Sequence, residues 1–99
     1  MTVEDDPVRV ARKPGVALSR TGDQALLVDD EGGSVHVVNR TAARVWELCD
    51  GSPTVESVVE SFARDYQLAP ATARSDIAHI LDSFRGLGLV ELGGSSSNG

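Results

Sequence analysis

Residues 35–51, VHVVNRTAARVWELCDG, decide the fold, because a β-prone run gives way there to a helix with one apolar face. Asn39 separates the two segments and is a favourable helix N-cap, since its side-chain oxygen can accept a hydrogen bond from an unpaired N–H of the first turn. Apolar residues then recur at i, i+3, i+4 and i+7, at Ala42, Val45, Trp46 and Cys49. Gly51 follows, and glycine readily takes the left-handed conformation that ends a helix. We therefore expect a strand up to Asn39 and a helix from there to the Asp50-Gly51 pair.

The residues before this stretch predict two further strands joined by short turns. The first strand is expected at residues 16–19 and the second at 25–28, with a turn at residues 21–23 between them. Residues 29–33, DDEGG, then close a hairpin onto a third strand at residues 34–38, and the three acids are expected to be a solvated tip. Such a three-stranded antiparallel sheet is too small to be stable alone, so helices must cover it.

The residues after this stretch predict two more helices. Thr54 is the expected cap of the second helix, and Pro70 suits the first position of the third. Both segments keep the helical period, in the second at Val55, Val58, Val59, Phe62 and Tyr66, and in the third at Ala73, Ile77, Ile80, Leu81 and Phe84. Residues 89–92, LVEL, are expected to pack back as an extended segment.

The chain of 99 residues has the length of one domain. We expect a loose arm over residues 1–13, a folded domain over residues 14–92 and a flexible Gly/Ser tail over residues 93–99. The predicted class is α+β, with a three-stranded antiparallel sheet followed by three helices in a winged-helix-like arrangement.

Composition and charge argue against several classes of protein. The net charge is −6 and the nine basic residues are scattered, whereas a nucleic-acid footprint requires clustered Lys and Arg. The sequence has no apolar run long enough to span a bilayer and no signal-peptide core. We expect a cytoplasmic protein that binds neither nucleic acid nor membranes.

The sequence does not support catalysis, a metal or a cofactor. His36 and His79 lack ligand partners at metal-binding spacing, and no serine lies in a G-x-S-x-G motif. Cys49 lies on the apolar stripe of its helix, as a small core residue would. We therefore expect a protein that is not an enzyme.

The order and spacing of several motifs resemble the PqqD-like family. The resemblance extends over about residues 14–92. It rests on VVNRTAA at residues 37–43, VWELCDG at 45–51, TVE at 54–56, the SDI motif and helix of residues 75–81, and GLVE at 88–91. The resemblance implies a module that binds the leader segment of a ribosomally synthesised precursor peptide and presents the peptide to a modifying enzyme, often a radical S-adenosylmethionine enzyme.

In such modules, the resemblance implies, the leader adds as a strand to the third strand and is flanked by the third helix. Residues 35–38 are uncharged and contain no proline, so they can support strand addition, and we expect Val35, His36, Val37 and Val38 to bind the peptide. For the helix we favour the flank of Arg74, Ala78 and Leu81, with Ile77 below it, because a basic and apolar flank suits an acidic leader that contains leucine. The opposite flank carries Thr72, Asp76 and Ser83.

Three alternatives remain open at the level of sequence. The third strand could be covered by the N-terminal arm or by a second copy of the chain, which would make a homodimer. The module could be a winged helix that binds DNA, although the third helix offers only Arg74 and Arg85 against Asp76 and Asp82. It could also be an enzyme subunit or a dimerisation module with no peptide site.

Overall fold

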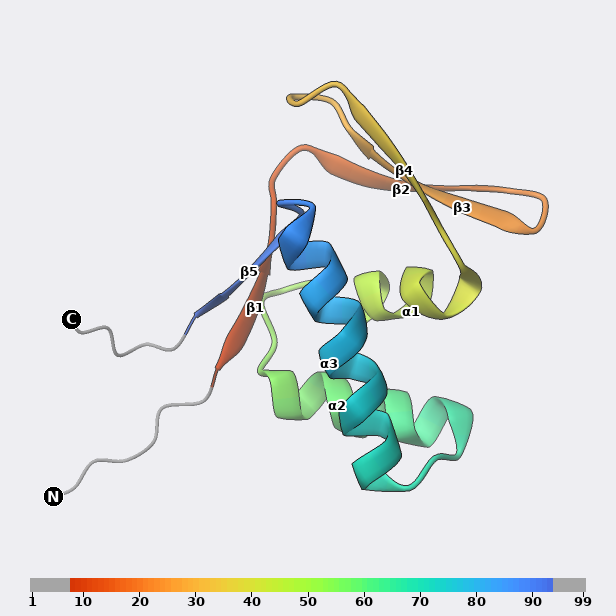
Figure 1. Ribbon diagram of the computed structural model, residues 1–99, viewed down its shortest axis with the longest axis vertical. Coiled ribbons are helices and arrows are strands. Elements are labelled where there is room, and N and C mark those ends of the chain that lie inside the picture. The colour runs from red at the N-terminus through yellow and green to blue at the C-terminus, as the bar shows by residue number, and fades with distance from the viewer. Residues whose placement is uncertain (1–7, 94–99) are drawn as a thin grey trace, which may run out of the picture.

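The computed structural model describes residues 8–93 and has an α+β fold. Its elements in chain order are β1 (Arg9–Arg12), β2 (Val16–Thr21), β3 (Gln24–Asp29), β4 (Ser34–Val38), α1 (Arg40–Leu48), α2 (Val55–Tyr66), α3 (Pro70–Gly86) and β5 (Val90–Gly93). In Figure 1 the sheet of β2, β3 and β4 lies at one end of the molecule, and the helices lie on one side of it. The predicted three-stranded sheet followed by three helices is confirmed.

The sheet has β3 in the middle, with β2 and β4 paired antiparallel on either side of it. Its register sets Leu27 of β3 opposite Leu18 of β2 and His36 of β4. Because side chains alternate across a strand, these residues share the face that turns toward the helices, where Leu27 is fully buried. Val35 and Val37 lie on the outer face and are 58% and 64% exposed.

Local capping fixes where the helices begin, as the sequence predicts. The Asn39 side chain accepts a hydrogen bond from the Ala42 N–H at 2.7 Å, and the Thr54 hydroxyl accepts one from the Ser57 N–H at 3.0 Å. Pro70 opens α3. Helix α1 ends at Leu48, slightly before the expected position, and Gly51 adopts a φ of +84° in the turn that follows. Among the three helices, only the exact end of α1 therefore differs from the prediction.

The expectation of a loose arm over residues 1–13 is corrected for residues 9–12. These residues form β1, which pairs antiparallel with β5 from Arg9 opposite Gly93 to Arg12 opposite Val90. On its other side the Val10 N–H donates to the Pro53 carbonyl at 2.9 Å, so the loop before α2 also holds the strand. Residues 89–92 do pack back as predicted, whereas Gly93, expected in the flexible tail, is the last residue of β5. Residues 1–7 of the expected arm and 94–99 of the expected tail lie outside the described residues.

The core lies where the apolar faces of the three helices meet the inner face of the sheet and the β1–β5 ribbon. Trp46 of α1 lies at its centre, 2% exposed, with its ring edge-on to that of Phe84 of α3 at 5.7 Å between centroids. The Arg12 guanidinium lies 5.0 Å from the centroid of the Trp46 ring. The core also contains residues from β1, β3, β5 and every helix, namely Val10, Leu27, Val45, Cys49, Val58, Val59, Phe62, Ala73, Ile77, Leu81, Leu89 and Val90.

The sequence predicts that all three acids of the hairpin tip are solvated, and this prediction is wrong for Asp29. The Asp29 side chain is buried, and both of its oxygens have partners: the Lys13 ammonium donates to one at 2.6 Å and the Gly32 N–H donates to the other at 2.9 Å. Asp30 and Glu31 are exposed, as expected. The Lys13–Asp29 ion pair therefore ties the β3–β4 hairpin to the segment that leaves β1.

Candidate peptide-binding groove

The main-chain hydrogen bonds show toward which neighbouring strand the N–H and C=O groups of each residue in the sheet point. The Asp30 N–H donates to the Gly15 carbonyl at 3.1 Å, which makes Val16 and Asp29 a pair without mutual hydrogen bonds. Antiparallel pairs alternate between bonded and non-bonded along a ladder. The N–H and C=O groups of Leu27 in the middle strand therefore point toward β4, where they bond His36.

The same alternation places the N–H and C=O groups of Val35 and Val37 on the free side of β4. No strand within residues 8–93 pairs with that side. The four main-chain groups of Val35 and Val37 are thus available to an added strand. Their side chains are also the most exposed large aliphatic ones on the sheet.

The other outer strand, β2, presents a less open edge. Arg20 lies on β2, and its guanidinium donates to the Glu47 carboxylate of α1 at 2.9 Å. A charged residue on an edge strand opposes strand addition, whereas β4 has no charged residue and no proline.

A hollow of about 270 Å³ lies between β4 and α3. It is uncharged, and its lining comes from the end of β4, the start of α1 and the C-terminal half of α3, namely Val37, Val38, Asn39, Ala42, Ile80, Ser83, Phe84 and Leu87. Phe84 forms its buried floor, and Leu87 is 50% exposed at its rim. We call the edge of β4 together with this hollow the β4–α3 groove.

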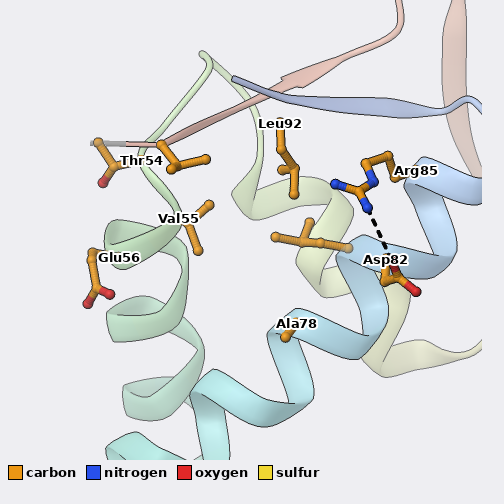
Figure 2. Close-up of a pocket in the computed structure, with 9 residues that line it drawn as sticks. Thr54, Val55, Glu56, Ala78, Asp82, Arg85 and Leu92 are labelled. Atoms are coloured by element: carbon orange, nitrogen blue, oxygen red, sulfur yellow. Dashed lines mark ion pairs between the residues drawn. The ribbon is translucent and has the colours of Figure 1, made fainter. Parts of the chain in front are cut away.

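A larger hollow, of about 410 Å³, lies on the opposite flank of α3. Figure 2 shows it between the first turn of α2, the middle of α3 and the β1–β5 ribbon, with Leu92 pointing toward α3. Aliphatic side chains line most of it, and the Arg85–Asp82 ion pair of 3.5 Å lies at its rim. This hollow is separate from β4, so size alone does not identify the peptide site.

The structure brings together only some of the residues that the sequence assigned to the peptide site. Val35, His36, Val37 and Val38 all lie on β4, the first and third facing outward and the other two facing the helices. The expected helix residues lie elsewhere. Ile77 is fully buried in the core, and Ala78 and Leu81 line the larger hollow.

Arg74 also lies away from β4, since its guanidinium donates to the Glu56 carboxylate of α2 at 2.9 Å. The hollow beside β4 is instead lined by Ile80, Ser83 and Phe84 of α3 and by Leu87, which directly follows the helix. Ser83 belongs to the other flank of the helix, with Thr72 and Asp76. The helical spacing of Ile80, Ser83 and Leu87 shows in the sequence that they share one flank. The sequence does not show how α3 is rotated relative to the sheet, and this rotation determines which flank faces β4.

Residues 8–93 contain no group of metal ligands, and their single cysteine is buried. Within residues 8–93 no three His, Cys, Asp or Glu side chains are close enough to hold a metal ion. Burial raises the pKa of the Cys49 thiol to about 11, so this cysteine stays protonated and unreactive at neutral pH. None of the helices in the same range combines the length and hydropathy needed to cross a bilayer.

Comparison with solved structures identifies the same fold in three proteins. TbiB1 in complex with the TbiA(beta) leader peptide has a TM-score of 0.70 at 17% identity, over 89% of this chain and 99% of that one. Lasso peptide synthetase B1 complexed with the leader peptide has a TM-score of 0.66 at 24% identity, over 83% and 96%. The PqqD truncation of Methylobacterium extorquens PqqCD, described as a stand-alone recognition element for ribosomally synthesised and modified peptides, has a TM-score of 0.70 at 22% identity, over 84% and 88%.

Sequence comparison gives the family. No curated protein matches the chain. The family model described as Coenzyme PQQ synthesis protein D (PqqD) matches residues 24–90, which is more than half of the 99 residues. That match runs from the start of β3 through all three helices to the first residue of β5. It includes the open strand and the helix that together form the β4–α3 groove, and the chain belongs to the PqqD family.

Proposed function

We propose that this chain is a non-catalytic module that captures the leader segment of a ribosomally synthesised precursor peptide in the β4–α3 groove. The observation that carries the proposal is the open edge of β4, where no strand within residues 8–93 pairs with the main-chain groups of Val35 and Val37, beside an uncharged hollow that Val37 helps to line. An added strand gains affinity from main-chain hydrogen bonds and selectivity from the pockets that receive alternate side chains. Two proteins of the same fold are described in complex with leader peptides, which supports this assignment.

The residues proposed to contact the leader come from both walls of the groove. On the strand side they are the predicted Val35, His36, Val37 and Val38, with the outward main-chain groups of Val35 and Val37 making the hydrogen bonds. On the helix side they are Ile80, Ser83 and Leu87, which replace Arg74, Ile77, Ala78 and Leu81 because none of those four lines the hollow beside β4. An uncharged lining favours leader residues with aliphatic or aromatic side chains.

The proposed partners are the precursor peptide and the enzyme that modifies it, a radical S-adenosylmethionine enzyme in our proposal, with no cofactor held by this chain. A homodimer through the unpaired strand edge is a further proposed assembly. We propose a cytoplasmic location, where precursor peptides are made.

An NMR titration with a synthetic peptide that has the leader sequence of the precursor tests the site. We expect the largest amide shifts at residues 35–38 and along the Ile80, Ser83 and Leu87 face of α3. Shifts confined to the larger hollow, around Ala78 and Leu92, would contradict the proposed site.

Proline substitution tests the strand edge itself. The Val37 N–H points away from β3, so Val37→Pro removes no hydrogen bond within the sheet but deletes one donor to the leader. We expect leader affinity to fall about tenfold or more, since a lost hydrogen bond and the steric effect of the ring together exceed roughly 1.4 kcal/mol. Isothermal titration calorimetry measures the change.

Two variants control this experiment. Val37→Thr keeps the donor and the branched side chain, and should change affinity little. His36→Pro removes a donor that bonds β3, so it should lower the melting temperature, whereas Val37→Pro should not do so to the same extent. Equal leader affinity of Val37→Pro and wild-type protein would rule out capture by strand addition.

A further inference from the structure

We infer that the modifying enzyme docks on the outer face of the sheet of β2, β3 and β4, and that bound leader enlarges the docking surface. The outer face is the one turned away from the helices, which lie together on the other side of the sheet (Figure 1). The choice of the enzyme and the part played by the leader rest on the proposed function, whereas the case for a docking face rests on the side chains that the sheet exposes.

The middle strand, β3, is aliphatic on both of its faces. A strand with one face in the core and the other in water normally alternates apolar and polar residues. In β3 the inward residues Ala25 and Leu27 are buried, but the outward residues Leu26 and Val28 are aliphatic as well. Neither outward residue is among the described side chains that form the core or pack against it. The core therefore does not account for Leu26 and Val28, whereas a partner surface does.

The register of the sheet gathers these side chains into one uncharged patch. Two rows of outward residues cross the three strands, one through Val28 and the other through Leu26. We call them the outer patch, which consists of Ala17, Ser19, Leu26, Val28, Val35 and Val37. Its most exposed aliphatic side chains belong to β4, at the edge where the leader is proposed to bind. Uncharged aliphatic surface of this kind is typical of the centre of a protein–protein interface.

Charge complementarity indicates the kind of partner that fits the outer patch. Exposed acids lie at both ends of the sheet, Asp23 in the β2–β3 turn and Asp30 and Glu31 in the β3–β4 turn. The one basic residue of the three strands, Arg20, is bound to Glu47 of α1 on the helix side. Two copies stacked face to face would set acids opposite acids at both ends, which is unfavourable. The patch instead fits an enzyme surface with an apolar centre and Lys or Arg on either side.

A leader strand added antiparallel to β4 continues the outer patch. Residues directly opposite each other in such a pair have their side chains on the same face of the sheet. The leader residues that bond Val35 and Val37 therefore point outward, beside the patch, whereas the leader residue opposite His36 points to the helix side, where the β4–α3 groove lies. The inward leader side chains would be recognised by this chain and the outward ones by the enzyme. The docking surface is then complete only when leader is bound.

Substitution of the two outward residues of β3 tests the docking face. Leu26→Thr combined with Val28→Thr removes aliphatic surface from the patch, keeps β-branched side chains and touches no residue of the β4–α3 groove. The probe is the purified, immobilised enzyme that modifies the precursor, and biolayer interferometry measures its affinity for the full chain saturated with synthetic leader peptide. We expect this affinity to fall about tenfold or more, while leader affinity, measured by calorimetry, stays within about twofold of wild type.

Three further variants complete the test. Ala17→Lys combined with Ser19→Lys puts two cations into the patch without removing a packed side chain, and it should weaken enzyme binding even if the threonine variant folds poorly. Reversal of the acids at both turns, Asp23→Lys, Asp30→Lys and Glu31→Lys together, should weaken enzyme binding and remove its decrease with rising salt. Val8→Thr, in the larger hollow, is the matched control and should change neither affinity. Melting temperatures show whether each variant is folded.

The outcomes separate the docking face from leader capture. An enzyme that does not bind the leader-loaded chain, or that binds the double variants as tightly as wild type, would overturn the docking face. Equal enzyme affinity for the free and the leader-loaded chain would overturn the part assigned to the leader. Self-association of wild type that is lost in the threonine variant would assign the face to a second copy and overturn the inference. If no leader binds, but the enzyme binds the free chain and the threonine variant weakens this binding, the docking face stands and the proposed function fails.

Discussion

Leu87 is a leucine that the fold leaves half exposed, at 50%, on the rim of the β4–α3 groove. It contributes little to the core, so Leu87→Ala should change the free energy of unfolding by no more than about 0.5 kcal/mol. Leader affinity should fall about fivefold to thirtyfold, as expected for loss of roughly 1–2 kcal/mol of apolar contact on binding. Calorimetric titration measures the leader affinity, and urea denaturation measures the free energy of unfolding.

Val8 provides the matched control for Leu87. It is similarly exposed, at 45%, but lines the larger hollow on the other flank of α3. Val8→Ala should leave leader affinity unchanged. A loss of affinity in Val8→Ala that equals the loss in Leu87→Ala would move the peptide site to the larger hollow.

Asp29 makes the stability of the sheet depend on pH. The Lys13 ammonium, followed by the Gly32 N–H, holds the pKa of the Asp29 carboxyl below its ordinary value of 3.8. A carboxyl whose pKa is lower in the folded state stabilises the fold above the unfolded pKa, and this contribution is lost as pH falls through the folded pKa. Asp29→Asn should therefore lower the melting temperature at pH 7, and the difference from wild type should shrink as pH falls below 3.8.

The neighbouring Asp30 gives the comparison for this pH dependence. Asp30 is exposed on the same tip, and Asp30→Asn should leave the melting temperature nearly unchanged across the same range of pH. Thermal denaturation, monitored by circular dichroism, measures the melting temperatures of wild type, Asp29→Asn and Asp30→Asn. A difference between wild type and Asp29→Asn that is constant with pH would show that the ion pair is not responsible.

At the scale of elements, the start of helix α1 is stabilised by a side-chain N-cap. The Asn39 side chain accepts from the Ala42 N–H at 2.7 Å and so completes the junction between β4 and α1. Asn39→Ala should lower the free energy of unfolding by about 1 kcal/mol, and Asn39→Ser should restore most of it. Urea denaturation measures both values. Equal stability of the Ala and Ser variants would show that the cap does not determine where α1 starts.

Elements whose ends are encoded by neighbouring residues could be predicted from the sequence. The hairpins have turn residues, α1 and α2 have polar caps, and α3 has Pro70 at its start, so these elements are placed with only small errors at their ends. Strand β1 was missed because residues 9–12 have no alternating pattern of their own. Its pairing with β5, about eighty residues away, depends on the whole fold.

For the proposed β4–α3 groove, the sequence indicates the residues of the strand wall but not those of the helix wall, for a physical reason. Strand alternation identifies Val35 and Val37 as one face of β4 without further information. For α3, periodicity shows which residues are buried and does not show which exposed flank faces β4. Both flanks of α3 border hollows, at Ala78 on one side and Ser83 on the other, and only packing against β4 distinguishes them.

At the scale of the whole molecule, Cys49 reports on global opening. It lies in the core at the end of α1 and is 1% exposed, and burial raises its pKa to about 11, so a disulfide reagent should react with it only when the domain unfolds. Leader peptide at ten times its dissociation constant should slow this reaction about tenfold, because a ligand that binds only the folded state lowers the unfolded population by that factor. Absorbance of the released thiolate measures the rate.

A reaction that the leader does not slow would show that Cys49 is reached by local opening away from the groove. The Cys49→Ser variant gives the background rate of the reagent.

The pairing of Arg9 with Gly93 brings the two ends of the described chain to one corner of the molecule, away from the three-stranded sheet (Figure 1). A fluorophore, a surface anchor or a fused protein attached at either end of residues 8–93 would therefore depart from this same corner. Either attachment would leave the free side of β4 accessible.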